Sequence, residues 1–176
     1  MNWLSFKEYN ISSFFIGGMS PEGEGYALED ERPDLADLQR IPRGMAELSR
    51  DGLGLLGRPE NELLASLVGD DTAPGLSAAA PAVAVDALFD VYPNTAEPAP
   101  WWRLGNLKRD GVDAILHALR HQTTPGMTAL CTLPLCELAR RYGDPSSTRL
   151  YDRDDLISRF MHQWGEDWLR ATSGNA

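Results

Sequence analysis

The sequence predicts a mainly α, α+β fold in a single compact domain spanning residues 1–176. Apolar residues make up 43% of the chain, enough to build a core. Most of them recur at helical spacing, in segments that begin and end at proline, glycine or acidic residues. A chain of 176 residues buries roughly two thirds of the surface that it exposes when unfolded. We therefore expect about five helices, a short N-terminal β element and one strand near 83–90.

The N-terminal β element is predicted at Phe14–Ile16, a short apolar run closed by two glycines. A short run bounded by glycine is typical of a strand. Residues 19–33 are acidic and are interrupted by glycine and proline, which predicts a surface loop. Residues 34–41 can then form one or two helical turns before the next proline.

A helix is predicted over residues 59–69, PENELLASLVG, with proline at its first position and glycine at its end. Glu60 and Glu62 lie in its first turn, where carboxylates stabilise the positive end of the helix dipole. Residues 70–82 are rich in alanine, proline and glycine. We interpret them as a long loop or an internal linker.

The segment VAVDALFDVY at 83–92 has apolar residues at alternate positions, which predicts a strand near 83–90. A helix that starts at Asp86 fits the pattern nearly as well. Trp101 and Trp102 follow as a pair. Adjacent residues do not share a face of a helix or strand, so we expect one indole in the core and the other partly exposed.

Three further helices are predicted in the C-terminal half of the chain. The first spans Leu107–His121, and the second runs from a cap at Thr132 to its end before Gly143. The third begins at a capping box of Asp152 and Asp155 and carries a broad apolar stripe. The apolar side of the first helix is expected to face inward: Val112, Ile115, Leu116 and Leu119. The predicted core is centred on Trp164, Trp168, Phe160, Leu138, Ile115 and Leu119. Residues 171–176 are predicted to be a disordered tail.

The net charge of −10 separates classes of partner. Nucleic acid and anionic membranes are repelled by such a chain, whereas a basic protein is attracted. No apolar run approaches the ~20 residues of a membrane span, and the N-terminus lacks the pattern of a signal peptide. Two cysteines fit a reducing compartment, and 14 arginines against 2 lysines are typical of a GC-rich bacterial genome. We therefore expect a bacterial, cytoplasmic protein.

The sequence favours a non-enzymatic protein-binding domain whose acidic surface docks a basic partner. A bacterial immunity protein or an inhibitor of a toxin is one concrete form of this function. No Gly-x-Ser-x-Gly, His-Glu-x-x-His or phosphate-loop motif is present, so no catalytic residue and no cofactor are predicted. The residues expected to contact the partner are Glu22, Glu24, Glu29, Asp30, Glu31, Asp34, Asp37 and Trp102.

An enzyme or metal-binding domain is the alternative. His117 and His121 stand four residues apart, so they share one helix face, and Cys131 and Cys136 follow nearby. Two histidines and two cysteines are ligands that zinc accepts in a tetrahedral site. The competing interpretation is that the cysteines are small buried side chains among leucines and the histidines are surface residues.

A nucleic-acid-binding helix–loop–helix module at 132–165 is the third interpretation. Its pattern rests on two groups of residues: Leu135, Glu137, Leu138 and Ala139, then Arg153, Asp155, Leu156 and Ile157. This stretch resembles SAP domains and the N-terminal domain of the transcription terminator Rho. The resemblance implies nucleic-acid binding through basic residues of the loop and second helix. Here the second helix opens with Asp152, Asp154 and Asp155, which oppose contact with phosphate.

Overall fold

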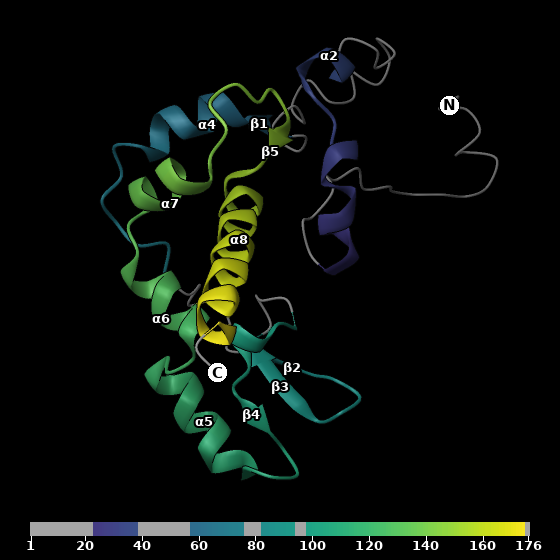
Figure 1. The fold of residues 1–176 in the computed structure, drawn as a ribbon, viewed down its shortest axis with the longest axis vertical. Coiled ribbons are helices and arrows are strands. Elements are labelled where there is room, and N and C mark those ends of the chain that lie inside the picture. The colour runs from purple at the N-terminus through teal and green to yellow at the C-terminus, as the bar shows by residue number, and fades with distance from the viewer. Residues whose placement is uncertain (1–22, 39–56, 76–81, 94–97, 175–176) are drawn as a thin grey trace, which may run out of the picture.

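The computed structural model describes residues 23–38, 57–75, 82–93 and 98–174 (Figure 1). Within them the mainly helical α+β class is confirmed. The predicted strand at Phe14–Ile16 lies outside the described residues. The helices are η1 (Gly23–Glu31, a 3-10 helix), α2 (Leu35–Leu38), α4 (Glu60–Leu67), η3 (Pro100–Trp102, a 3-10 helix), α5 (Gly111–His121), α6 (Pro125–Thr132), α7 (Leu135–Tyr142) and α8 (Arg153–Ser173). The strands are β1 (Arg58–Pro59), β2 (Val83–Val85), β3 (Asp90–Pro93), β4 (Gly105–Asn106) and β5 (Leu150–Tyr151).

Helix α8 is the axis around which the other elements are arranged (Figure 1). It contacts α6, α7, η3 and β5. Helices α4 and α7 lie beside its first half, and the strands β2, β3 and β4 lie near its C-terminal end with α5 beyond them. The helix begins as the sequence predicts, because the Asp152 carboxylate accepts a hydrogen bond of 2.8 Å from the Asp155 amide.

The region between α5 and α7 differs from the prediction, because a separate helix, α6, precedes α7. Its N-cap is Thr124, whose hydroxyl accepts a hydrogen bond from the Met127 amide at 3.2 Å. Thr132, predicted to cap the following helix, is instead the last residue of α6. Proline at the first position of α6 is favourable for the same reason as at any helix start. The missed signal was therefore the sequence TTPG, which can cap a helix as well as form a turn.

The segment 83–92 forms a hairpin of two strands in place of one strand. Strand β2 pairs antiparallel with β3, which pairs antiparallel with β4. The Asp86 carboxylate accepts hydrogen bonds from the amides of Leu88 and Asp90, at 2.8 and 2.9 Å. This turn geometry overrides the alternating pattern of apolar residues. The second sheet is the two-stranded pair β1–β5, which joins segments about ninety residues apart.

Both tryptophans of the adjacent pair are buried, contrary to the expectation that one would be exposed. They sit on η3, which contacts both α6 and α8, so both of its sides are covered. Glycines make this close approach possible. A Cβ atom on Gly126 would lie 2.6 Å from Cε3 of Trp102, and one on Gly165 would lie even closer to the indole of Trp101. Trp102 is 5% exposed and is therefore not accessible as a partner contact.

The core agrees with the prediction in its centre and differs at its edges. Phe160, Leu138 and Ile115 are buried, whereas Leu119, Trp164 and Trp168 are partly buried and pack against the core from outside. The predicted inward face of the helix over 107–121 is largely exposed, including Val112 and Leu116. The described residues therefore cover the apolar face of this helix only in part.

The predicted loop and tail are only partly described. Residues 70–75 of the 70–82 segment are joined to the helical region by backbone hydrogen bonds, including one from the Cys136 amide to the Asp70 carbonyl at 2.9 Å. Helix α8 continues to Ser173, so the first three residues of the predicted tail at 171–176 are helical. The division of the chain into one domain stays a prediction.

Replacing Gly165 by alanine is expected to destabilise the protein. The new methyl group would overlap the indole of Trp101, a rigid side chain that is itself buried. Overpacking of this kind costs about 1–3 kcal/mol, which exceeds the ~1 kcal/mol that alanine contributes in a helix. Urea denaturation of Gly165→Ala and the wild type measures the difference in free energy of unfolding.

Gly69→Ala is the matched control for this prediction. No atom lies within 4 Å of a Cβ placed on Gly69, so this substitution meets open space. We expect its free energy of unfolding to stay within about 0.5 kcal/mol of the wild type. Equal stability of the two variants would show that Gly165 is not a packing requirement.

Candidate functional site

A buried ion pair joins α4 to α8. Glu60 is 0% exposed, and its Oε1 accepts hydrogen bonds from Nη2 of Arg159 and from the Asp144 amide, the latter at 2.9 Å. Nη1 of Arg159 donates to the Tyr151 hydroxyl at 3.0 Å. The pair therefore connects two helices, strand β5 and the loop after α7. Glu60 lies in the first turn of α4 as predicted, but the structure places its side chain in the interior, where it pairs with Arg159.

The ion pair supports the segment that carries most of the predicted contact residues. Next to it, Arg32 is buried and donates to the Leu150 carbonyl at 3.0 Å. Its guanidinium lies 4.2 Å from the ring centre of Tyr151, on which Arg159 also lies, at 4.9 Å. Tyr26 stacks on His162 with ring centres 3.7 Å apart. Residues 23–38 are thus held against β5 and α8 by buried and aromatic side chains.

Two acidic segments far apart in sequence meet as a result. Residues 30–37 lie beside the start of α8, because Asp34 forms a β-bridge with Arg149 and Arg32 lies 3.6 Å from the Asp155 carboxylate. We call the group of carboxylates contributed by both segments the acidic end. Its members are Asp30, Glu31, Asp34, Asp37, Asp152, Asp154 and Asp155. In Figure 1 it lies at the top of the molecule, around α2, β5 and the first turn of α8.

The predicted contact residues within the acidic end differ in their roles. The Asp34 carboxylate accepts from the Asp37 amide at 3.0 Å, and the Asp37 carboxylate accepts from the Asp34 amide at 3.1 Å. They form a reciprocal capping box at the start of α2. Asp30 pairs with Arg149 at 2.6 Å but remains 91% exposed at its side chain. Glu31 is exposed and makes no ion pair with a described residue.

The other predicted contacts are less informative. Glu22 lies outside the described residues. For Glu24 and Glu29, which lie in η1, the structure describes the backbone and not the side chain. Trp102 is excluded by its burial. Asp154, which was interpreted only as part of a helix start, is exposed, and it belongs to the acidic end because its neighbour Asp155 lies 3.6 Å from Arg32. Its membership depends on a tertiary contact that no local pattern indicates.

The proposed metal ligands are not brought together. His117 and His121 do share one exposed face of α5, with ring centres 4.3 Å apart. Cys136 is buried, and its thiol donates to the Asp71 carboxylate at 3.2 Å while Nη2 of Arg140 donates to its sulfur at 3.1 Å. Cys131 is half-buried on α6. Among the described residues, which include all four, no three His, Cys, Asp or Glu side chains form a metal-binding group.

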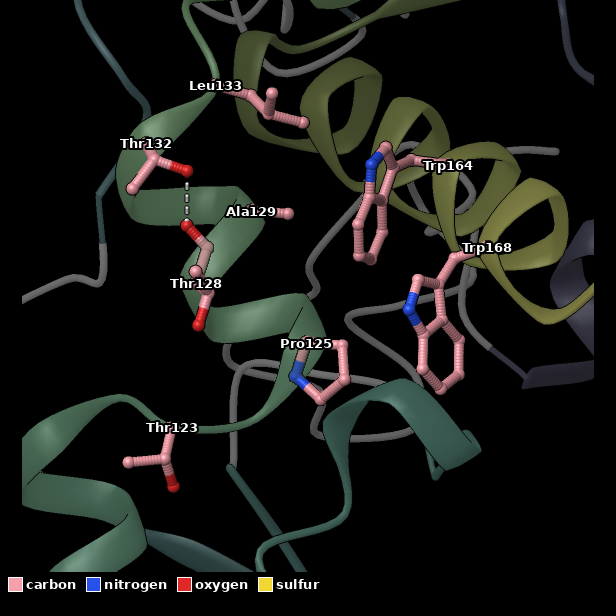
Figure 2. Close-up of a pocket in the computed structure, with 8 residues that line it drawn as sticks. All are labelled: Thr123, Pro125, Thr128, Ala129, Thr132, Leu133, Trp164 and Trp168. Carbon is pink, nitrogen blue, oxygen red and sulfur yellow. Dashed lines mark hydrogen bonds between the residues drawn. The ribbon is translucent and has the colours of Figure 1, made fainter. Parts of the chain in front are cut away.

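A groove lies between α6 and α8, with Trp164 and Trp168 forming one wall (Figure 2). Its volume is 340 Å³, near the lower limit of ligand pockets. The α6 side contributes the other residues of the lining: Thr123, Pro125, Thr128, Ala129, Thr132 and Leu133. The Thr132 hydroxyl donates a hydrogen bond to the Thr128 carbonyl at 2.7 Å, so its proton is used within α6. None of these side chains is charged, so the groove offers no ion pair to a basic partner.

A polar cluster joins α7 to α8. The Tyr142 hydroxyl donates to the Asp167 carboxylate at 3.0 Å, and Nη2 of Arg141 donates to the same oxygen at 2.9 Å. Burial, and then the hydrogen bond to Asp167, raise the pKa of Tyr142 to about 12. The same hydroxyl, followed by Arg141, holds the pKa of Asp167 below its ordinary value. The cluster is a structural contact between the helices.

Comparisons with protein-family models, with curated proteins and with solved structures found no match to this chain. Among the described residues, no helix is both long and apolar enough to cross a membrane.

Alkaline pH is expected to reveal the Tyr142 contact. The pKa of its phenol in the folded protein, about 12, lies above its ordinary value of 10.0. Folding therefore favours the protonated phenol, and this contribution to stability is complete below pH 10 and is lost as the pH rises to 12. Tyr142→Phe has no phenol to titrate, so its stability relative to the wild type should increase over this window. Denaturation at a series of pH values measures the change.

Asp167→Asn distinguishes the two causes of the raised pKa of Tyr142, which are burial and the hydrogen bond to Asp167. Burial is the larger cause, so this variant should lower the pKa of Tyr142 only part of the way towards 10, as followed by phenolate absorbance. A phenol at position 142 that titrates at the ordinary pKa in the wild type would contradict the contact.

Proposed function

We propose that this chain is a protein-binding domain that docks a basic partner on its acidic end. The observation that supports the proposal is the meeting of residues 30–37 with the start of α8. Together they bring seven carboxylates to one region. The same two segments contribute three arginines: Arg32, Arg149 and Arg153. Of these arginines, Arg32 is buried.

The distribution of charge along the chain agrees with this location. Residues 23–38 contain six Asp and Glu against one arginine, whereas residues 98–174 contain nine Asp and Glu against ten Lys and Arg. A basic protein is therefore attracted more strongly by residues 23–38 than by residues 98–174 taken as a whole. Such complementarity accelerates association and makes it sensitive to salt.

The same segment also offers apolar surface. Leu28 and Leu35 are exposed, within η1 and α2. Protein interfaces combine apolar contacts near their centre with a charged or polar rim. A basic partner with apolar side chains between its Lys and Arg residues fits this composition. An immunity protein or an inhibitor that neutralises a basic toxin is one form of such a function.

The acidic end disfavours the nucleic-acid interpretation of residues 132–165. That segment does form two helices, α7 and α8, which contact one another. The start of the second helix is part of the acidic end, where phosphate groups would be repelled. We therefore favour a basic protein over nucleic acid as the partner.

Reversing the charge of two exposed residues tests the location. Glu31→Lys/Asp154→Lys should weaken binding of an oligolysine peptide by about tenfold. This corresponds to about 1.4 kcal/mol from two exposed charges. Fluorescence anisotropy of the labelled peptide at low salt gives the dissociation constant, and increasing salt should weaken wild-type binding.

Asp113→Lys/Glu137→Lys is the matched control. It makes the same change in net charge at exposed residues, each in the first turn of a helix outside the acidic end. Binding should decrease much less in this variant. If both variants lose affinity equally, the peptide responds to net charge alone and the acidic end is not the docking surface. Affinity capture from the native organism with the wild type and both variants then identifies the partner by mass spectrometry.

A further inference from the structure

Among the described residues, the exposed apolar side chains are concentrated away from the acidic end. Eleven large hydrophobic residues are exposed among those described, and seven of them lie between positions 83 and 116. We call these seven the apolar end: Val83, Val85, Leu88, Phe89, Leu107, Val112 and Leu116. They belong to β2, its turn, the β4–α5 connection and α5, at the bottom of Figure 1.

Hydrogen bonds join the parts of the apolar end. The Leu107 amide donates to the Phe89 carbonyl at 2.9 Å, and the Asn106 side chain donates to the Leu88 carbonyl at 2.9 Å. Lys108 places its ammonium 3.6 Å from the ring centre of Phe89. The β2–β3 turn and the β4–α5 connection are therefore neighbours.

Two secondary-structure elements of the apolar end lack the cover that their sequences require. Helix α5 is amphipathic, yet Ile115 is its one fully buried side chain, and Val112 and Leu116 on its apolar side are exposed. Strand β2 is the terminal strand of its sheet, with β3 on one edge and no strand on the other among the described residues. An exposed apolar edge strand is a template for pairing with another chain.

The turn between β2 and β3 holds its apolar residues in an exposed position. Leu88 is 75% exposed, and the Asp86 carboxylate fixes its amide. Phe89 has a positive φ of 67°, a conformation that is rarely adopted by a bulky side chain. Backbone strain of this kind often occurs where a contact requires it. A rigid turn that presents an apolar side chain loses little entropy on binding.

The charge of this region selects among possible partners. The described residues between 82 and 121 contain four acidic and four basic side chains, within a chain of net charge −10. A basic partner gains nothing here. Two copies of the chain repel one another most strongly when their acidic ends approach. The repulsion is weakest when the two copies meet through this neutral region.

We propose that the apolar end is a self-association surface through which two copies of this chain form a symmetric dimer. Pairing of the two β2 edges antiparallel to one another satisfies a twofold axis, because the same edge serves both copies. The Leu88 turn and the apolar side of α5 then cover their equivalents in the other copy. The acidic ends of the two copies remain outside the interface, available to basic partners. This inference does not depend on the proposed function.

Sedimentation equilibrium of the full chain at submillimolar concentration tests the proposal. The wild type should show twice the mass of one chain, and Val85→Lys/Leu88→Lys should show the mass of one chain. Lysine on an edge strand opposes pairing, and both residues are exposed, so the monomer fold should be retained, as circular dichroism would show. A wild type that is monomeric, or a variant that remains dimeric, would overturn the proposal.

Val68→Lys/Leu169→Lys is the matched control, since Val68 is 48% exposed and Val85 49%. It makes the same change in charge at exposed apolar residues outside the apolar end and should remain dimeric. Salt gives a second measurement. Screening of the net charge should strengthen self-association, whereas it weakens the binding of a basic peptide. Self-association that weakens with salt, or that is lost equally in the control, would contradict an apolar, neutral interface.

Discussion

The buried pair of Glu60 and Arg159 is the interaction on which this fold depends. An isolated charge in the protein interior is strongly unfavourable, so each member requires the other. Because Glu60 begins α4 and Arg159 lies in α8, the requirement brings both helices to β5 and to the loop after α7. The backbone follows the same path, since the Glu60 amide donates to the Arg149 carbonyl at 2.9 Å. Residues 23–38 then pack on β5 and α8 through Tyr26 and Arg32.

This arrangement divides the surface into two regions with different properties. The acidic end forms where residues 30–37 meet the start of α8, and the apolar end lies at the opposite end of the molecule (Figure 1). Opposite locations allow one region to bind a basic protein while the other binds a second copy. Two copies joined in this way would present two acidic ends, and bivalent binding raises the apparent affinity for a partner with repeated basic sites.

The sequence predicted the elements whose signals are local. The start of α8 at Asp152, the buried side of Leu138 and Phe160, and the helix after Pro59 are confirmed. The remaining errors have tertiary causes. In the sequence, Glu60 looks like an ordinary acidic residue in the first turn of a helix. Its partner Arg159 lies 99 positions away, so no local pattern indicates the pairing. Only half of the acidic end was predicted. Residues 30–37 form a visible acidic run, whereas their contact with Asp155 at the start of α8 depends on packing. Trp102 is hidden because Gly126 leaves room for its ring.

The most direct test of this account is a double-mutant cycle on the buried pair. Glu60→Met and Arg159→Met should each lower the free energy of unfolding by about 3–5 kcal/mol, because each leaves one buried charge alone. The double variant replaces both charges by apolar groups and should lose far less than the sum of the two. Urea denaturation of the four proteins gives the coupling energy. Additive losses would contradict the account, because they would show that the two side chains do not depend on one another.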